Sequence, residues 1–261
     1  MSDRVAAAQA LAADPGRSGL VLDFDGVLAP IVADPAASAL PDRVADSLAR
    51  LARRLGLVAI ISGRPAVFLA DRVALPGVPL LGSYGMEQYR DGVRLIDPKA
   101  AEWLGPVHEA DRSLRVLLAG SDGIQVEEKS VSVAVHWRQA PDHAAAAEEV
   151  RRVTARLAED LGLQLEPGKL VAELRPPIDV DKGSAVGKLL AAHPGLSAFA
   201  YAGDDLGDLP ALRAARAAGG YALVIDHGPE TDPRLRELAD ETFDGTDAFA
   251  DWLGKLADAV T

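Results

Sequence analysis

Short apolar runs alternate with amphipathic segments at both ends of the chain. Residues 19–24 and 57–61 are continuous apolar runs bounded by Gly or polar residues, which is typical of buried parallel strands. Residues 41–55 carry apolar side chains at helical spacing, and residues 65–73 form a further helical segment. The same alternation resumes over residues 182–256. It predicts an α/β fold with a doubly wound, mostly parallel, Rossmann-like core sheet.

A different pattern interrupts this order in the middle of the chain. Residues 98–118 and 142–161 have helical spacing, and each segment is followed by two short strand-like runs. A helix–hairpin–helix–hairpin order does not belong to a doubly wound sheet. We therefore predict an α+β cap domain at residues 99–178, inserted into a core made of residues 1–98 and 179–261. We expect a cleft between the two domains, with the cap determining substrate specificity.

Composition narrows the class of protein and its partners. The 261 residues are 49% apolar and 25% charged, as in ordinary globular proteins, and contain no Cys, which excludes disulfides and thiolate nucleophiles. The net charge of −12 disfavours nucleic acid and anionic membranes as partners. We expect Ser2 to cap a first helix rather than to begin a signal peptide. The expected protein is cytoplasmic, a monomer or weak homodimer, and acts on a small molecule.

Acidic residues follow two of the predicted strands. The first two, Asp23 and Asp25, are separated by one residue at the carboxyl end of the run 19–24, so on strand geometry they should point the same way. In open α/β sheets, ligands bind at the carboxyl ends of strands. Grouped carboxylates at the end of an apolar strand need a cation, and Mg²⁺ prefers such oxygen ligands, although simple capping of loops is an alternative. The predicted metal-binding residues are Asp23, Asp25, Asp204, Asp205 and Asp208.

Two further segments carry groups suited to an anion. Ser62, Gly63 and Arg64 follow the apolar run 57–61 and combine a hydroxyl, an open backbone and a guanidinium. Lys182 begins a predicted helix, where a positive charge opposes the helix dipole. Taken alone, Ser62 is equally consistent with a helix cap, and Lys182 with a solvated surface residue.

Four parts of the chain, taken in order, resemble the motifs of haloacid dehalogenase superfamily phosphatases. They are DFDGVL at 23–28, SGR at 62–64, Lys182 and GDDLGD at 203–208. Within that superfamily the chain resembles the trehalose-6-phosphate phosphatases. The segments that carry this closer resemblance are GSYGMEQ at 82–88, EEKSVSVAVHWR at 127–138 and ELRPPIDVDKG at 173–183. The resemblance implies Mg²⁺-dependent hydrolysis of trehalose 6-phosphate to trehalose and phosphate through an aspartyl-phosphate.

The resemblance also implies a role for each candidate residue. Asp23 would be the nucleophile, and Asp25 the general acid and then the base. Ser62, Gly63 and Lys182 would bind the phosphoryl oxygens. Asp204 would bind Mg²⁺ together with Asp23 and the Asp25 carbonyl, with Asp205 and Asp208 supporting that site. The residues implied to face the sugar are Arg64, Lys129, His136, Arg138 and Glu173.

Two departures from the family pattern keep other functions open. Tyr84 stands where the family has His, and Gly207 stands where it has Thr. A phosphatase of another disaccharide, pseudo-disaccharide or glycosyl phosphate therefore remains an alternative. A catalytically weak sugar-phosphate-binding regulator is a further one. The histidines at 108, 143, 193 and 227 have no metal-binding spacing and are expected to be surface or structural residues.

Overall fold

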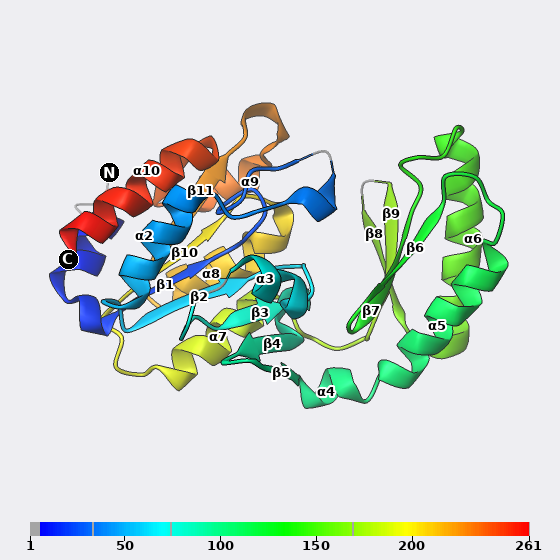
Figure 1. The fold of residues 1–261 in the computed structure, drawn as a ribbon, viewed down its shortest axis with the longest axis horizontal. Helices are drawn as coiled ribbons and strands as arrows, with labels where there is room; N and C mark the ends of the chain where they lie inside the picture. The colour runs from blue at the N-terminus through cyan, green and yellow to red at the C-terminus, as the bar shows by residue number, and fades with distance from the viewer. Residues whose placement is uncertain (1–5, 33, 74, 169, 261) are drawn as a thin grey trace. The chain divides into compact units, whose positions relative to one another are not determined.

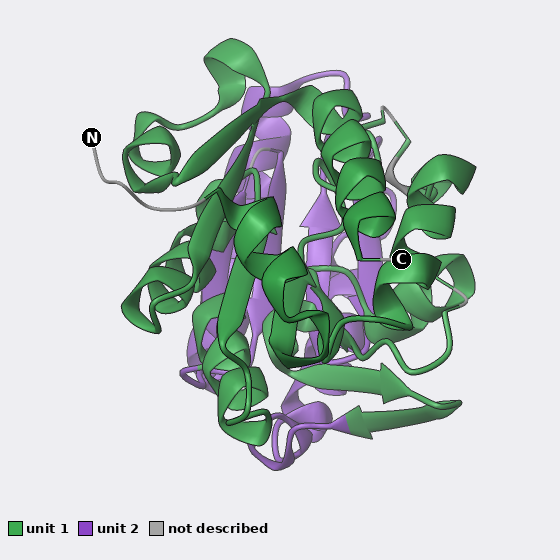
Figure 2. Ribbon diagram, turned by 90° about the vertical axis from the view of Figure 1, so that its left-hand side faces the viewer, with its two compact units in different colours: residues 1–95, 180–261 green, residues 96–179 purple. Residues whose placement is uncertain are grey.

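The chain divides into two compact units. The computed structural model describes residues 6–32, 34–73, 75–168 and 170–260, so the expected Ser2 cap lies outside the described residues. The first unit combines Met1–Leu95 with Val180–Thr261, and the second is Ile96–Asp179 (Figure 2). The predicted insert at 99–178 falls inside the second unit. Within the described residues, no helix has the length and apolar character needed to cross a membrane.

The first unit is built on an eight-stranded sheet in the order β12-β11-β10-β1-β2-β3-β4-β5 (Figure 1). Neighbouring strands from β12 through to β3 pair in parallel, and β4 is antiparallel to β3. The strands are β1 (Ser18–Leu22), β2 (Leu57–Ile61), β3 (Leu80–Gly82), β4 (Glu87–Arg90), β5 (Val93–Ile96), β10 (Ala198–Gly203), β11 (Tyr221–Asp226) and β12 (Glu241–Asp244). The mostly parallel, doubly wound sheet confirms the predicted fold class.

Helices cover both faces of this sheet, which explains why β1 and β2 are buried along their whole length. One apolar cluster joins the sheet to α1 (Ala7–Ala13), α2 (Asp42–Ala52), α3 (Ala66–Arg72) and α10 (Gly245–Ala259). A second cluster joins the other face to α7 (Lys182–Ala192), α8 (Leu209–Ala217) and α9 (Pro233–Leu238). With both faces packed, the carboxyl ends of the central strands are fixed in place.

The second unit is a four-stranded antiparallel sheet in the order β6-β7-β9-β8. The strands are β6 (Gln125–Lys129), β7 (Ser132–His136), β8 (Gln164–Gly168) and β9 (Val171–Arg175). Val133, Val135 and Leu174 pack in one cluster with apolar residues of α5 (Leu104–Leu117) and α6 (His143–Leu161). Because side chains alternate along a strand, the residues between them face the opposite side of the sheet.

Several elements differ from the sequence prediction, which included neither α9 nor β12. The single helix expected over 98–118 is broken into α4 (Pro98–Ala101) and α5, with Glu102 and Trp103 between them. The β4–β5 hairpin was not predicted. Its two-residue connection, Asp91 and Gly92, has φ values of 51° and 82°, as a type I′ turn requires.

Candidate active site

Two neighbouring strands bring the acidic motifs to one edge of the sheet. Leu22, the last residue of β1, lies opposite Ala202 in β10. The next residue, Asp23, donates its backbone N–H to the Ala202 carbonyl at 2.9 Å. Asp204 follows the end of β10. The parallel register therefore places Asp23 and Asp204 side by side at the carboxyl ends of the central strands.

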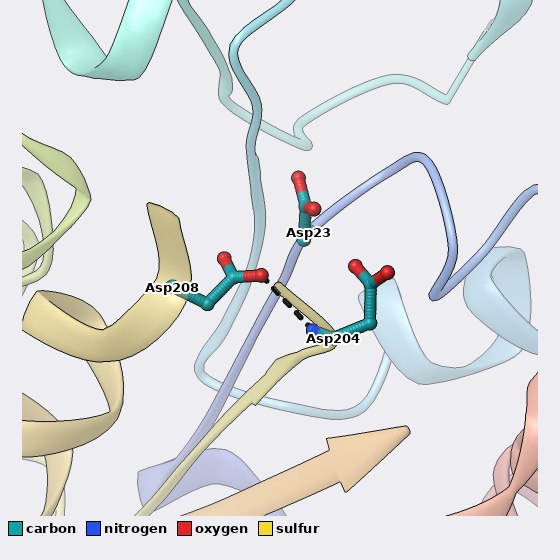
Figure 3. Close-up of side chains that lie close together, drawn as sticks. All are labelled: Asp23, Asp204 and Asp208. Atoms are coloured by element: carbon teal, nitrogen blue, oxygen red, sulfur yellow. Dashed lines mark hydrogen bonds between the residues drawn. The ribbon is translucent and has the colours of Figure 1, made fainter. Parts of the chain in front are cut away.

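Three carboxylates form the centre of the site. Asp23, Asp204 and Asp208 each offer an oxygen atom, and these atoms lie within 4.8 Å of one another (Figure 3). Asp23 is 4% exposed and Asp208 is fully buried. Like charges held this close in a dry environment repel strongly unless a cation or protons offset them. We call these three residues the carboxylate cluster.

Asp208 organises the cluster. Its Oδ1 accepts hydrogen bonds from Lys182 Nζ at 2.7 Å and from the Tyr201 hydroxyl at 2.5 Å. Its Oδ2 accepts the backbone N–H groups of Asp204 at 3.0 Å and Asp205 at 3.2 Å. Four donors use the roughly four lone-pair positions of a carboxylate. Asp208 is therefore suited to hold its neighbours in place rather than to bind a ligand directly.

Lys182 is buried beside the nucleophile candidate. It is the first residue of α7, whose start is fixed by a capping box between Asp181 and Ser184, and it is 3% exposed. Its Nζ lies 3.0 Å from Asp23 Oδ1, although that ion pair lacks hydrogen-bond geometry. Among the described residues, no group donates a hydrogen bond to this buried oxygen. An unsatisfied carboxylate oxygen at such a site indicates a ligand position.

Burial and mutual repulsion shift the pKa values of the site residues. Burial raises the pKa of Asp23 well above its usual range, against the opposing effect of Lys182. Burial, reinforced by the charges of Asp23 and Asp208, raises the pKa of Asp204 to about 9. Burial alone would lower the pKa of Lys182, but the Asp208 and Asp23 carboxylates outweigh it and raise that pKa well above normal. Lys182 therefore remains charged, and it leaves the three carboxylates with an excess of negative charge.

The residues fit Mg²⁺. The donors are hard carboxylate oxygens, one of them is unsatisfied, and burial raises the pKa values of Asp23 and Asp204, whose charged forms a bound cation would stabilise. Asp23 and Asp204 are the members with oxygen atoms available. Gly26 supports this arrangement, because its φ is +75° and a Cβ there would lie 2.2 Å from Asp204 Oδ2. Only glycine lets Asp204 approach the loop after β1 so closely.

We expect Mg²⁺ binding to release protons and to tighten as the pH rises. Asp204, with a pKa of about 9 in the metal-free chain, is protonated at pH 7 and must lose that proton to bind the ion. Calorimetry in two buffers of different ionisation enthalpy should then give different apparent enthalpies, and Asp204→Asn should remove much of this difference. An unfolded Asp ionises near pH 4, whereas Asp204 in the folded chain keeps its proton to about pH 9. The free energy of unfolding of the metal-free chain should therefore fall as the pH rises from about 4 to about 9. Identical enthalpies in both buffers would contradict the shifted pKa.

Asp25 does not join the carboxylate cluster. Its two oxygens accept hydrogen bonds from Arg64, Nε at 2.6 Å and Nη2 at 3.0 Å, and Ser38 Oγ donates to it at 2.8 Å. The Asp25 carboxylate is therefore paired with Arg64 and Ser38, outside the carboxylate cluster. β1 ends at Leu22, so the alternation of a strand does not extend to Asp25.

The other predicted phosphate and metal residues lie around the cluster. Ser62 follows β2 and is buried, and its Oγ accepts the Arg64 N–H at 3.2 Å. Asp205 directs its carboxylate to the Gly207 N–H at 2.8 Å, as the cap of a short turn, η4 (Leu206–Asp208). The structure thus groups three of the five predicted metal residues, while Asp25 and Asp205 have other partners.

His227 is a site residue that the sequence prediction missed. It follows β11, and its Nε2 lies 2.9 Å from the Gly26 carbonyl, to which it donates, and 3.5 Å from Asp204 Oδ2. The sequence analysis expected a surface or structural residue and did not place it beside Asp204. Residues that contact a metal ligand without binding the metal themselves help to orient that ligand. The position of His227 next to Asp204 suits this role. No local motif marked it, because Gly26 is 201 residues away in the sequence.

The candidate sugar-binding residues of the second unit form two polar groups on its sheet. Glu173 Oε2 pairs with Lys129 Nζ at 2.9 Å, and Glu173 Oε1 accepts the Ser132 hydroxyl at 2.5 Å. His136 Nε2 lies 2.8 Å from Glu127 Oε2. Arg138 is exposed just after β7. Lys129, His136 and Glu173 therefore lie on the face opposite α5 and α6, within reach of a ligand on that face.

The fold and the carboxylate cluster together define a class. A doubly wound sheet, an inserted α+β unit, and aspartates with a buried Lys at the carboxyl ends of the central strands are the arrangement of the haloacid dehalogenase superfamily. Sequence comparison narrows this class, because residues 21–234 match the trehalose-phosphatase family. The chain belongs to that family.

Individual relatives agree with this membership. A trehalose-phosphate phosphatase of Mycobacterium marinum is 32% identical over 270 residues, which cover all of this chain and 68% of that protein. An uncharacterized glycosyl hydrolase of Mycobacterium tuberculosis is 36% identical over 225 residues, 84% of this chain but only 17% of that longer protein. A crystal structure of a trehalose-6-phosphate phosphatase related protein superposes with a TM-score of 0.78, covering 92% of this chain and 97% of that one. At 21% identity, this last likeness shows the fold alone.

Proposed function

We propose that the protein is a Mg²⁺-dependent phosphatase that hydrolyses trehalose 6-phosphate to trehalose and phosphate through an aspartyl-phosphate on Asp23. The observation that carries the proposal is the buried Asp23 with an unsatisfied oxygen beside Lys182, in a chain of the trehalose-phosphatase family. When bound by Asp23, Asp204 and the Asp25 carbonyl, Mg²⁺ would offset negative charge on the phosphoryl group.

In the first step, a carboxylate oxygen of Asp23 attacks phosphorus, and the bond from phosphorus to the sugar oxygen breaks. Asp25 gives a proton to that leaving oxygen. In the second step, water attacks the aspartyl-phosphate while Asp25 accepts a proton from it, which restores Asp23 and releases phosphate. Lys182 stabilises charge on the phosphoryl oxygens, and Ser62 with the Gly63 backbone holds them.

Arg64 has to change partners for this cycle to run. Both oxygens of Asp25 accept hydrogen bonds from Arg64, so Asp25 is held as an acceptor. A carboxyl that donates a proton to the leaving group needs one oxygen protonated and free of that guanidinium. We infer that the incoming substrate draws Arg64 away from Asp25.

The second unit is proposed to supply sugar contacts. Lys129, His136, Arg138 and Glu173 offer charged and hydrogen-bonding groups of the kind that sugar hydroxyls require. The absence of Cys from the sequence suits a reducing compartment, and we propose the cytoplasm. We also propose that the protein is a monomer or a weak homodimer.

A substrate panel with and without Mg²⁺ tests this function. We expect phosphate release from trehalose 6-phosphate to exceed release from glucose 6-phosphate, sucrose 6-phosphate and glucosylglycerol phosphate, and to stop when EDTA removes the metal. Faster release from one of the other glycosyl phosphates would favour the alternative that Tyr84 and Gly207 keep open. Tight binding of trehalose 6-phosphate with no release from any substrate would instead indicate a regulator.

A further inference from the structure

Tyr84 and Gly207 lie against each other. Tyr84 lies in the turn η3 (Ser83–Gly85), and Gly207 lies in η4 after β10. A Cβ built on Gly207 would lie 3.7 Å from Tyr84 Cε1, in ordinary contact with the ring. A larger side chain at position 207 would compete with the ring for this space. Tyr84 and Gly207 therefore form one local arrangement.

The backbone holds Tyr84 firmly against the loop after β2. The Tyr84 N–H donates to the Ser62 carbonyl at 2.9 Å, and the Ser83 N–H donates to the Arg64 carbonyl at 2.8 Å. Ser83 and Tyr84 both have positive φ, 50° and 60°. Residues other than glycine adopt this conformation where the surroundings impose it, and such positions concentrate at functional sites.

The ring spans the end of the nucleophile's strand. A Cβ on Gly63 would lie 2.9 Å from Tyr84 Cζ and 3.0 Å from its hydroxyl oxygen, so the tip of the ring lies directly on Gly63. Gly63 follows β2 and Gly207 follows β10, and β1 lies between these two strands in the sheet. A side chain that contacts both loops therefore crosses the carboxyl end of β1, the edge at which Asp23 emerges.

We propose that the Tyr84 ring is a specificity-determining surface for the leaving group, selecting phosphates of sugar rings; this inference rests on the proposed function. The ring is half-buried and uncharged, and its face offers an apolar surface to the C–H groups of a sugar. Binding sites commonly combine such an aromatic wall with a few polar groups that fix orientation. Here Arg64 and Ser62 lie on the loop that the ring covers.

The test compares how variants treat a sugar phosphate and a phosphate without a sugar. The full chain with Mg²⁺ is assayed on trehalose 6-phosphate and on p-nitrophenyl phosphate. Tyr84→Ala should lower kcat/KM for trehalose 6-phosphate at least tenfold more than for p-nitrophenyl phosphate, mainly through KM. Tyr84→Phe, which keeps the ring, should lose less than Tyr84→Ala. If Tyr84→Ala fails to fold, Tyr84→Leu replaces it as the variant without a ring.

The matched control is Tyr89→Phe, because Tyr89 lies on β4 and packs against the hydrophobic core. It should leave the ratio between the two substrates unchanged. Equal losses on both substrates in Tyr84→Ala would overturn the inference while leaving the phosphatase function intact. If the wild type releases no phosphate, the proposed function fails separately. Calorimetric binding of trehalose 6-phosphate then decides, and equal Kd values for wild type and Tyr84→Ala would overturn the role of the ring.

Discussion

Asp23→Asn should reduce phosphate release by at least about 10⁴-fold, the scale of loss when an enzyme's nucleophile is removed. The amide has nearly the same shape but cannot form the aspartyl-phosphate. The fold should survive, because burial already disfavours the charged form of Asp23, whose pKa is raised. Lys182 also keeps its shorter contact, 2.7 Å to Asp208.

Three measurements distinguish the loss of the nucleophile from unfolding of the variant. Turnover of trehalose 6-phosphate should vanish, the Mg²⁺-free melting temperature at pH 8 should stay the same or rise, and mass spectrometry of acid-quenched enzyme should show no phosphorylated protein. Asp46→Asn, at an exposed position of α2, is the matched control and should keep full activity. Substantial turnover by Asp23→Asn would rule out the covalent mechanism.

Asp208→Ala should have the largest effect on stability, about 3–5 kcal/mol in the free energy of unfolding. The substitution leaves the buried Lys182 ammonium, the Tyr201 hydroxyl and two backbone N–H groups without their acceptor. For a chain of this length, the loss corresponds to a fall in melting temperature of roughly 10 °C. Activity should fall as well, because Lys182 and Asp204 lose the group that positions them.

The comparison variant is Asp251→Ala. Like Asp208, Asp251 pairs with a basic residue, Arg43, at 3.1 Å, but both side chains are more than half exposed, and such pairs contribute about 0–1 kcal/mol. Tyr201→Phe should be intermediate, near 1 kcal/mol, since it removes one neutral donor. Differential scanning calorimetry of the three variants checks the order. Equal melting temperatures for Asp208→Ala and Asp251→Ala would show that Asp208 is not the organising residue.

The strand ends were predictable because their signal is local. The apolar runs before Asp23, Ser62 and Asp204 are short, continuous and bounded by polar residues, as strands buried on both faces must be. The order of parallel strands then brings their carboxyl ends to one edge. The outer hairpin was missed for the opposite reason. Val93 and Leu95 on β5 are 55% and 57% exposed, so no buried run marked them, although Asp91-Gly92 is a hairpin signal.

The partners of individual site residues were not predictable in the same way. Asp25 binds Arg64, 39 residues away, and not the carboxylate cluster, because the chain leaves the strand before it. His227 meets Gly26 only after β11 has taken its place in the sheet. The contact between Tyr84 and Gly207 likewise depends on the packing of two turns. Each of these contacts is formed by tertiary structure, so no sequence pattern within either segment predicts it.

The pairing of β1 with β10 has a consequence for how the protein is made. Ser18 pairs with Ala198, 180 residues later in the chain, and the whole second unit is synthesised between them. Because chains are synthesised at about 5–20 residues per second, one apolar edge of β1 stays without its partner strand for on the order of 10–40 seconds. Unpaired apolar strand edges invite pairing with other chains. The nascent chain therefore exposes an unpaired apolar edge of the kind that chaperones bind, and the carboxylate cluster cannot form until residue 208 has left the ribosome.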